Sequence, residues 1–435
     1  MLKKLYSNMY FQSFFATGAS SAIAMGSFMI LTRVMEMKDF GEWVLYLTLL
    51  TFVDQLRTGL VASGLIKYSG GCEVKEKNQL IGSSWVINII SLLVITIVFQ
   101  SFYWLNLSAS KGFQLFILFY PLYGFLSMPF FYFRWNSEVA LEFKKITYIQ
   151  LFNSFGFLIV CVVAIFTQFT LEQIVLLNIL IFGVSSLICL PRKECGIEYF
   201  FSASKLSINK IISFGKFHLL AHLGSHLLRS VDVILIGLFL SPVAVAIYGV
   251  ATRMVVLIAL PLNSIVKVAF PLLSALVNKG EIRVMRNTLE KYIGILSFLY
   301  LPLVFILYLI STHLILFIGG ENYIDSVIVF QIFLGAAIFI SFNKLVGVAL
   351  DSLGLPNLNF YRLLLMALVN ILGDIFVLYF YQSIELVALV TLVNILVGVT
   401  VGYLMLRKEI GLSLNSIFIN SVNTTLSFLR KSLNS

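Results

Sequence analysis

Long apolar runs separated by short polar stretches dominate the pattern of the chain. About 20 consecutive apolar residues are needed for one helix to cross the hydrocarbon core of a bilayer, and most of the runs reach this length. Charged residues and clusters of Gly, Pro and Asn end them. The pattern predicts helices at 11–32, 43–65, 80–104, 113–133, 146–167, 171–190, 211–240, 243–275, 292–318, 326–350, 359–380 and 384–406.

Six predicted helices precede a basic connector in the chain, and six follow it. We predict an all-α polytopic membrane protein of about 12 transmembrane helices, in two six-helix bundles around a central cleft. The parts are an N-terminal six-helix bundle at 1–190, a basic cytoplasmic connector at 191–210, a C-terminal six-helix bundle at 211–406 and a cytoplasmic amphipathic tail at 407–435. Apolar residues recur in the tail at helical spacing, which is typical of a helix on the membrane surface or of a frayed end.

Composition excludes a soluble domain of ordinary size. Hydrophobic residues make up 60% of the 435 residues and charged residues only 11%, against about 25% charged in soluble domains; the mean hydropathy is +0.98. No small-residue cleavage site follows the first apolar run, so we expect it to be retained as a span. The cysteines have neither CxxC nor metal-site spacing, and we expect no disulfide and no structural zinc; they are Cys72, Cys161, Cys189 and Cys195.

The distribution of basic residues predicts the orientation in the membrane. If the N-terminus is cytoplasmic, the segments on that side hold 22 of the 30 Lys and Arg residues, and the opposite side holds only Arg33, Lys38 and Lys111. Cytoplasmic loops of membrane proteins collect Lys and Arg. We therefore expect both termini to be cytoplasmic.

The first helix of each predicted bundle carries a polar or small-residue stripe, and an offset of 205 residues brings the two stripes into register. Parallel internal repeats are common in transporters, and residues spaced three and four apart share a helix face. The register predicts that both stripes line a hydrated cleft, although the small residues at 11–32 are also typical of close helix packing. The stripes are Ser13, Thr17, Ser20, Ala24 and Ser27, and His218, His222, Ser225, His226, Arg229 and Asp232.

Five basic residues fall inside apolar runs, namely Arg57, Arg229, Arg253, Lys267 and Lys344. A charge at mid-membrane costs roughly 2.5–3.5 kcal/mol on insertion scales, so each must pair, line water or bind a ligand. The i,i+3 spacing predicts pairs of Asp54 with Arg57 and of Arg229 with Asp232. The deep acids are only Asp54, Asp232 and Asp374, so the interior is net positive and favours an anionic cargo. Snorkelling to the interface is the alternative for Arg253, Lys267 and Lys344.

Three histidines share one face of the helix at 211–240, namely His218, His222 and His226. No carboxylate or cysteine completes a ligand set, and Arg229 one turn away repels cations, so we expect a hydrated or pH-sensitive cavity lining and no metal. The chain has no nucleotide-binding loop, nucleophile elbow or paired catalytic carboxylates. We therefore expect no enzyme activity, no cofactor and no nucleic-acid partner.

The stretch from Asp232 to Pro271 resembles the signature of polysaccharide flippases in the multidrug/oligosaccharidyl-lipid/polysaccharide (MOP) exporter superfamily. An Asp, an apolar run, a short loop, a Tyr, an Ala-x-Arg and two prolines follow one another in that family, and here they are Asp232, Tyr248, Ala251, Thr252, Arg253, Pro261 and Pro271. The whole chain also resembles the family in its six-plus-six plan. The Wzx-type O-antigen flippases of the polysaccharide transporter branch are the most similar, because they combine twelve helices with a cationic cavity.

The resemblance implies a flippase of the bacterial inner membrane that moves an undecaprenyl-diphosphate-linked oligosaccharide from the cytoplasmic to the periplasmic leaflet. Implied partners are the bilayer, the O-antigen polymerase and the chain-length regulator. Arg229, Arg253, Arg57, Lys267 and Lys344 would form the cationic cavity. The implied polar lining is Asp232, Asp54, His218, His222, His226, Ser20 and Ser27.

Two other functions stay open. One is a drug/cation antiporter of the same superfamily, which would need an acidic cavity. The other is an O-antigen polymerase-type membrane enzyme, for which a large basic external loop is expected and not found in this sequence.

Overall fold

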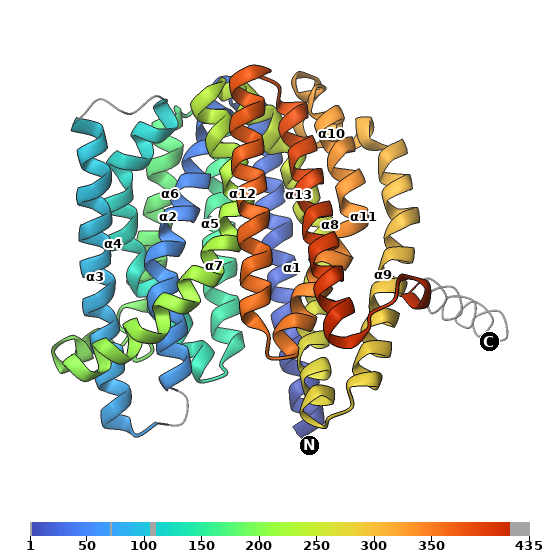
Figure 1. Cartoon of the computed structure of the whole chain (residues 1–435). Coiled ribbons are helices and arrows are strands. Elements are labelled where there is room, and N and C mark those ends of the chain that lie inside the picture. Colours follow the sequence, from blue (N-terminus) through green and yellow to red (C-terminus); the bar gives the residue numbers. More distant parts are fainter. Residues whose placement is uncertain (1, 70–71, 105–109, 418–435) are drawn as a thin grey trace. The chain divides into compact units, whose positions relative to one another are not determined.

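The protein is described by a computed structural model of the whole chain (Figure 1). It describes residues 2–69, 72–104 and 110–417, with all side chains of these except residues 2–17, 216–227, 229, 260, 263–264 and 267. Among these residues the regular structure is entirely helical. The tail beyond residue 417 lies outside the described residues, and so does the stripe predicted there.

Thirteen α-helices and two short 3-10 helices make up the described chain. The first half contains α1 (Leu2–Val34), α2 (Met37–Ser69), α3 (Val74–Trp104), α4 (Lys111–Val139), α5 (Phe143–Thr167), α6 (Leu171–Cys189) and the 3-10 helix η1 (Ile197–Ser202). The second half contains α7 (Lys205–Phe239), α8 (Pro242–Asn278), α9 (Ile282–Leu309), α10 (Ser311–Gly319), η2 (Glu321–Tyr323), α11 (Ser326–Ser352), α12 (Pro356–Phe380) and α13 (Ile384–Ile410).

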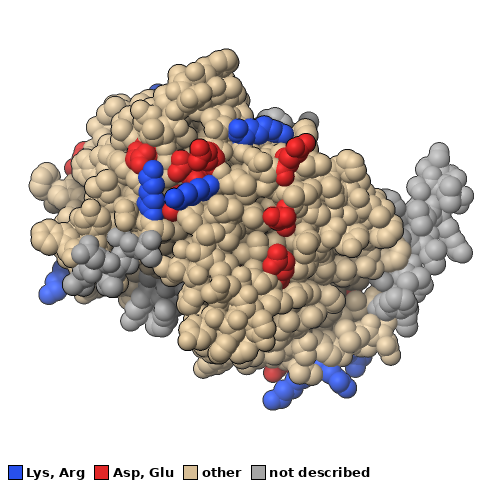
Figure 2. Space-filling model, turned by 90° about the horizontal axis from the view of Figure 1, so that it is seen from above, with Lys and Arg blue, Asp and Glu red and all other residues tan. Residues whose placement is uncertain are grey.

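The helices confirm the prediction of a polytopic all-α membrane protein. Ten helices in the described part are long and apolar enough to cross a membrane, and α1 and α7 contribute shorter apolar stretches, Gly18–Val34 and Ser230–Phe239. In the space-filling view of Figure 2, uncharged residues form most of the surface, and Lys, Arg, Asp and Glu are few. Lys111 and Glu172 form an ion pair of 2.7 Å between the starts of α4 and α6.

Short polar residues set the beginnings of several helices. The first N–H groups of a helix have no partner within it, and an N-cap hydroxyl satisfies one of them. Ser110 accepts the N–H of Phe113 at the start of α4, Thr170 that of Gln173 at α6, and Ser383 that of Leu386 at α13. These caps explain why the predicted and observed starts of these helices nearly coincide.

The predicted helix at 292–318 is wrong as a single element, because the structure divides it into α9 and α10 at Ile310. The hydroxyl of Ser311 donates to the carbonyl of Tyr308 at 2.8 Å and accepts the side-chain amide of Gln331 at 2.9 Å. A side-chain hydroxyl that bonds its own backbone competes with the helical ladder. Ser311, Thr312 and His313 form a short polar triplet at the break, but the apolar residues on both sides let the hydropathy pattern run on as one helix.

The described chain forms two compact units whose limits do not follow the connector. Unit 1 comprises Met1–His226 and Ser241–Ala246, and unit 2 comprises Leu227–Leu240 and Ile247–Ser435. Each of the helices α7 and α8 thus contributes to both units. Within unit 1, α1 packs on α5 and α4 packs on both α2 and α6, and within unit 2, α11 and α12 pack on α13.

Gly41 marks a close approach inside unit 1. A Cβ atom built on Gly41 of α2 would lie 1.7 Å from the carbonyl oxygen of Pro242, at the start of α8. No side chain fits at this distance, so only glycine allows the two helix starts to touch.

We expect Gly41→Ala to destabilise the protein by about 1–3 kcal/mol, because the two backbones must separate. Gly335→Ala in α11 is the matched control, since no atom lies within 4 Å of its Cβ position. The unfolding temperature of both purified variants in detergent measures the effect. An equal temperature for the two variants would contradict the close approach.

Candidate functional site

A buried ion pair joins Arg57 and Asp54 on α2. Both the Nε and an Nη of Arg57 donate to one carboxylate oxygen of Asp54, at 2.9 and 2.6 Å. Arg57 is completely buried and Asp54 nearly so. The i,i+3 pair predicted from the sequence is therefore confirmed.

The remaining donors of Arg57 reach two neighbouring helices. They bond the side-chain oxygen of Asn88 on α3 at 2.9 Å, and on α4 the carbonyl of Gly124 and the hydroxyl of Ser127, each at 3.2 Å. A fixed fork of donors that finds all its acceptors holds those acceptors in place. Arg57 thus links α2, α3 and α4, and in this conformation it is not accessible to a ligand.

Two polar pockets adjoin one another in unit 1 and share Phe131 and Arg134 of α4. The first has a volume of 280 Å³ and the second a volume of 240 Å³. The first is lined from α2 and α4 by Gln55, Thr58, Gly59, Ala62, Ser63, Ile66, Phe131, Arg134, Trp135 and Glu138. The second is lined from α1, α4, α5 and α6 by Ser20, Phe130, Phe131, Arg134, Gln150, Asn153, Ser154 and Phe182.

Arg134 is the half-buried cation of this twin pocket. Among the described residues it takes part in no ion pair, and the nearest acid along its helix is Glu138, one turn on, at the rim of the first pocket. The rings of Phe131 and Trp135 stack beside it with centroids 5.8 Å apart. Side-chain amides and hydroxyls complete the walls, so the twin pocket offers one cation, one carboxylate at Glu138, aromatic faces and neutral hydrogen-bonding groups.

Sequence reasoning missed Arg134 because the predicted helix ended at residue 133 and Arg134 was counted as a cytoplasmic loop residue. In the structure α4 continues to Val139. Arg362 was counted among the cytoplasmic basic residues, at the start of the predicted helix 359–380; it is buried in α12, where it donates to Asn343 at 2.8 Å and to Asn359 at 3.0 Å. A charge near the end of an apolar run can belong either to the loop or to the last helical turns, and hydropathy alone does not separate the two.

A second polar cluster lies in unit 2 around Asp232 of α7. Its carboxylate accepts hydrogen bonds from the hydroxyl of Tyr248, from Thr391 at 2.9 Å and from the amide of Asn370 at 2.6 Å. The same amide of Asn370 also donates to Asp374 at 3.0 Å. Four helices, α7, α8, α12 and α13, thus meet at one carboxylate.

The cluster holds two buried carboxylates and is not fully satisfied. Asp374 is completely buried and Asp232 is 5% exposed. Within the described part of the chain, one oxygen of Asp374 has no hydrogen-bond partner, and neither does the amide oxygen of Asn394, whose amide nitrogen donates to Asn370. Among the described residues no basic side chain pairs with either acid. A buried acid costs free energy unless a positive charge or a proton compensates it. The side chain of Arg229, the partner that the sequence predicts for Asp232, lies outside the described residues, and the alternatives to it are a small cation or a proton.

The other predicted site residues are spread over the chain. Ser20 lines the second pocket with a buried hydroxyl that has no partner. Ser27 is buried, and its hydroxyl donates to the carbonyl of Ile23 in its own helix. Arg253 and Lys344 are half-buried in α8 and α11 of unit 2. The side chains of Arg229, Lys267, His218, His222 and His226 lie outside the described residues.

Comparison with known proteins shows a family match that covers most of the chain. The family described as polysaccharide biosynthesis protein matches residues 30–328. The teichuronic acid biosynthesis protein TuaB of Bacillus subtilis (strain 168) is 27% identical over 201 residues. That alignment covers 45% of this chain and 40% of TuaB, so the chain spans about two fifths of the length of this relative.

Similar solved structures show the same fold. A multidrug resistance MATE family transporter of the MOP superfamily, in an inward-facing conformation, has a TM-score of 0.75 at 13% identity over 90% of this chain and 94% of its own. The lipid II flippase MurJ, in an inward closed conformation, also has a TM-score of 0.75 at 13% identity, over 97% of this chain and 92% of its own. A MOP superfamily transporter from Pyrococcus furiosus has a TM-score of 0.61 at 13% identity, over 93% of this chain and 94% of its own.

We expect Asp54→Leu to destabilise unit 1 by about 3–5 kcal/mol, because it leaves the buried guanidinium of Arg57 uncompensated. Arg57→Met has a comparable effect, whereas the double variant costs less than either single change. Unfolding temperatures and detergent-soluble yields of the three variants form a double-mutant cycle. Additive effects of the two single changes would show that the pair is not coupled.

Proposed function

Because the chain belongs to the family of polysaccharide biosynthesis proteins, we propose that it is a flippase that moves an undecaprenyl-diphosphate-linked oligosaccharide across the bacterial inner membrane. The cargo is a repeat unit of O-antigen or of a similar surface polysaccharide, and it passes from the cytoplasmic to the periplasmic leaflet by alternating access. Both termini are cytoplasmic in this proposal. The functions of TuaB and of MurJ, teichuronic acid biosynthesis and lipid II flipping, support a lipid-linked glycan as the cargo class.

The single observation that carries the proposal is Arg134 at the junction of the two pockets of unit 1. Arg134 forms no ion pair among the described residues, and its guanidinium is suited to a phosphate oxygen, which it can bind through two parallel hydrogen bonds. The amides of Gln55, Gln150 and Asn153 provide donors and acceptors for sugar hydroxyls, and Trp135 provides an apolar face. An apolar drug would not use these groups, and a cationic drug would be repelled by Arg134.

The cationic residues predicted from the sequence enter the proposal at different points. Arg229, Arg253, Lys267 and Lys344 attract the diphosphate along its path, and His218, His222 and His226 line that path. Arg57 and Asp54 contribute indirectly: the guanidinium carbon of Arg57 lies 6.0 Å from the centre of the Phe131 ring, which lines both pockets. We propose that the pair positions this wall of the twin pocket.

Two sources of free energy are available for net export. Moving a dianion out of a cell that is negative inside is downhill by about 4.6 kcal/mol per 100 mV. The carboxylate cluster of unit 2 adds a place for a coupling ion, because the open oxygen of Asp374, Asp232 and the neighbouring amide oxygens offer the hard ligands that a small cation prefers. The proposed coupling ion is Na⁺ or H⁺.

The polymerase and the chain-length regulator remain proposed partners, because the repeat unit must be polymerised after it crosses the membrane. The drug/cation antiporter is the second candidate function, and the acidic cluster around Asp232 and Asp374 is the observation that favours it. The polymerase-type enzyme has no comparable support. Gene deletion separates the three functions. Loss of a flippase would make single lipid-linked repeat units accumulate, and loss of a polymerase would leave single units capped on lipid A. Loss of an antiporter would leave the surface glycan unchanged.

We expect Arg134→Ala to lower export of the glycan roughly 10- to 100-fold, since the loss of charge-assisted hydrogen bonds costs about 1.5–3 kcal/mol. Arg134→Lys should retain part of the activity. Arg283→Ala, at an exposed position of α9, is the matched control and should have no effect. Complementation of the deletion strain, with surface polysaccharide and lipid-linked units measured together at equal protein levels, tests this. Full export by Arg134→Ala would refute the assignment of the twin pocket.

For the carboxylate cluster we expect Na⁺ or a lower pH to raise the unfolding temperature of the purified protein, because a bound cation stabilises the folded state. Asp374→Asn keeps the shape, removes the charge and should abolish the effect. Asp325→Asn, at an exposed position, is the control. Titration in NaCl against choline chloride, repeated over a pH series, separates the two ions. If neither Na⁺ nor a lower pH changed the unfolding temperature of the wild-type protein, the cluster would have a structural role alone.

A further inference from the structure

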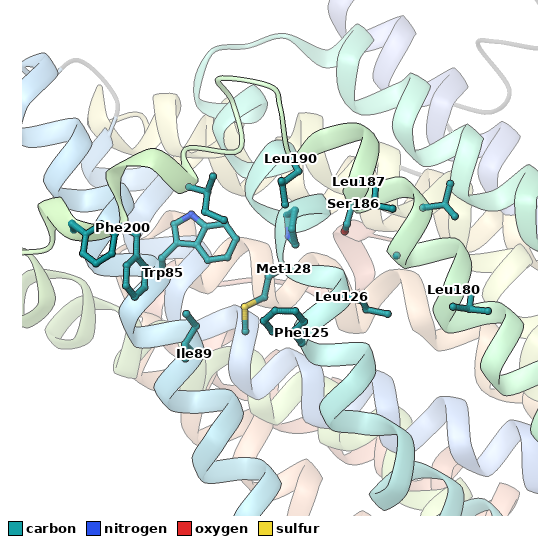
Figure 3. A pocket seen from close by; sticks show the side chains of 15 residues that line it. Trp85, Ile89, Phe125, Leu126, Met128, Leu180, Ser186, Leu187, Leu190 and Phe200 are labelled. Atoms are coloured by element: carbon teal, nitrogen blue, oxygen red, sulfur yellow. The ribbon is translucent and has the colours of Figure 1, made fainter.

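An apolar groove lies in unit 1 (Figure 3), and it shares no lining residue with the twin pocket. It has a volume of 540 Å³ and is formed by α3, α4, α6 and the chain that follows α6. Trp85 and Ile89 line it from α3, Phe125 from α4, Val184 and Leu187 from α6, and Phe200 from η1. The volume is in the range of small-molecule binding sites.

The few polar groups in the groove are already occupied. The indole N–H of Trp85 donates to the carbonyl of Cys195 at 3.3 Å, and the hydroxyl of Ser186 accepts the N–H of Phe130 at 3.2 Å. Among these two side chains, a ligand with polar groups would find little more than the O–H of Ser186. Phe125 is 66% exposed and Leu187 is 69% exposed, so the groove opens toward lipid and suits a hydrocarbon chain.

Basic side chains stand at one end of the groove. Leu190 and Ile197 line it, and between them run the exposed residues Arg192 and Lys193. Burial alone would raise the pKa of Glu194, but its hydrogen bond with Lys145 holds this pKa below the ordinary value. Glu194 is thus paired with Lys145, which also pairs with Glu142, and Glu198 is a further exposed acid on this segment. Arg192 and Lys193 are adjacent exposed cations that form no ion pair among the described residues, and such a pair of cations suits an anionic headgroup.

The packing of α4 on α6 separates the groove from the twin pocket. The rings of Phe130 and Phe182 meet edge to face, 5.5 Å apart, and both line the second pocket. Their chain neighbours Pro129 and Gly183 line the groove. A lipid whose headgroup occupied the twin pocket would have to cross this packed layer to place its tail in the groove. The occupant is therefore a separate molecule from the cargo.

We propose that the groove binds one acyl chain of an anionic membrane phospholipid, with the headgroup on Arg192 and Lys193. The site is independent of the proposed transport, since it uses none of the residues assigned to the cargo. A bound lipid would rest against the connector at residues 191–202, and so stabilise its packing on α3 and α4.

The test uses the full-length protein in mild detergent, incubated with dioleoyl phosphatidylglycerol or dioleoyl phosphatidylcholine and examined by native mass spectrometry. We expect retention of phosphatidylglycerol by the wild type and its loss from Val184→Trp, which fills the groove. Val393→Trp is the matched control, because Val184 is 48% exposed and Val393 is 50% exposed. Equal retention by the two variants would overturn the proposal.

The double variant Arg192→Glu/Lys193→Glu examines the headgroup separately. We expect it to lose the preference for phosphatidylglycerol over phosphatidylcholine, while Lys144→Glu, at an exposed position of α5, keeps that preference. Two results would contradict the assigned occupant. One is equal retention of both phospholipids by the wild type, and the other is displacement of phosphatidylglycerol by undecaprenyl phosphate, which would make the groove a site for the prenyl chain.

Discussion

A guanidinium buried away from water must find all its acceptors inside the protein, and the packing of unit 1 depends on how Arg57 meets this requirement. Asp54 on the same helix supplies the opposite charge, and α3 and α4 supply the remaining acceptors. The three helices are therefore held in one register by hydrogen bonds that lipid cannot replace. Because Phe131 packs near this guanidinium and also lines both pockets, the register of the helices determines the shape of the twin pocket.

Unit 2 also buries charged groups away from water, but these are carboxylates, and the hydrogen-bond donors of the cluster do not satisfy all of their oxygens. Asp232 is surrounded by donors from three other helices, but an oxygen of Asp374 has no partner in the cluster. A fully satisfied buried charge is typical of a structural element, whereas a buried acid with an open oxygen is typical of a site that exchanges an ion. The two units thus differ in how completely the buried charge is satisfied, although in both of them neighbouring helices supply its hydrogen-bond partners.

The transmembrane helices were predictable because lipid imposes a length and an apolar composition on every span. The Asp54–Arg57 pair was predictable because its spacing is local. The acceptors on Asn88, Gly124 and Ser127 were not, since they come from helices 31 to 70 residues further along the chain. Arg134 was missed for another reason. Its charge was taken as the end of the apolar run, whereas α4 continues past Arg134 to Val139.

The division of α7 and α8 between the units bears on how such a protein arises by gene duplication. An ancestral six-helix gene, copied in tandem, would place the junction at the connector, between the two predicted bundles. Unit 1 extends beyond that junction, because it includes α7 up to His226 and Ser241–Ala246 at the start of α8, whereas unit 2 lies entirely after the connector. A polypeptide that ended at the connector would lack these segments of unit 1, so the first half of such a gene depends on chain that the second half encodes.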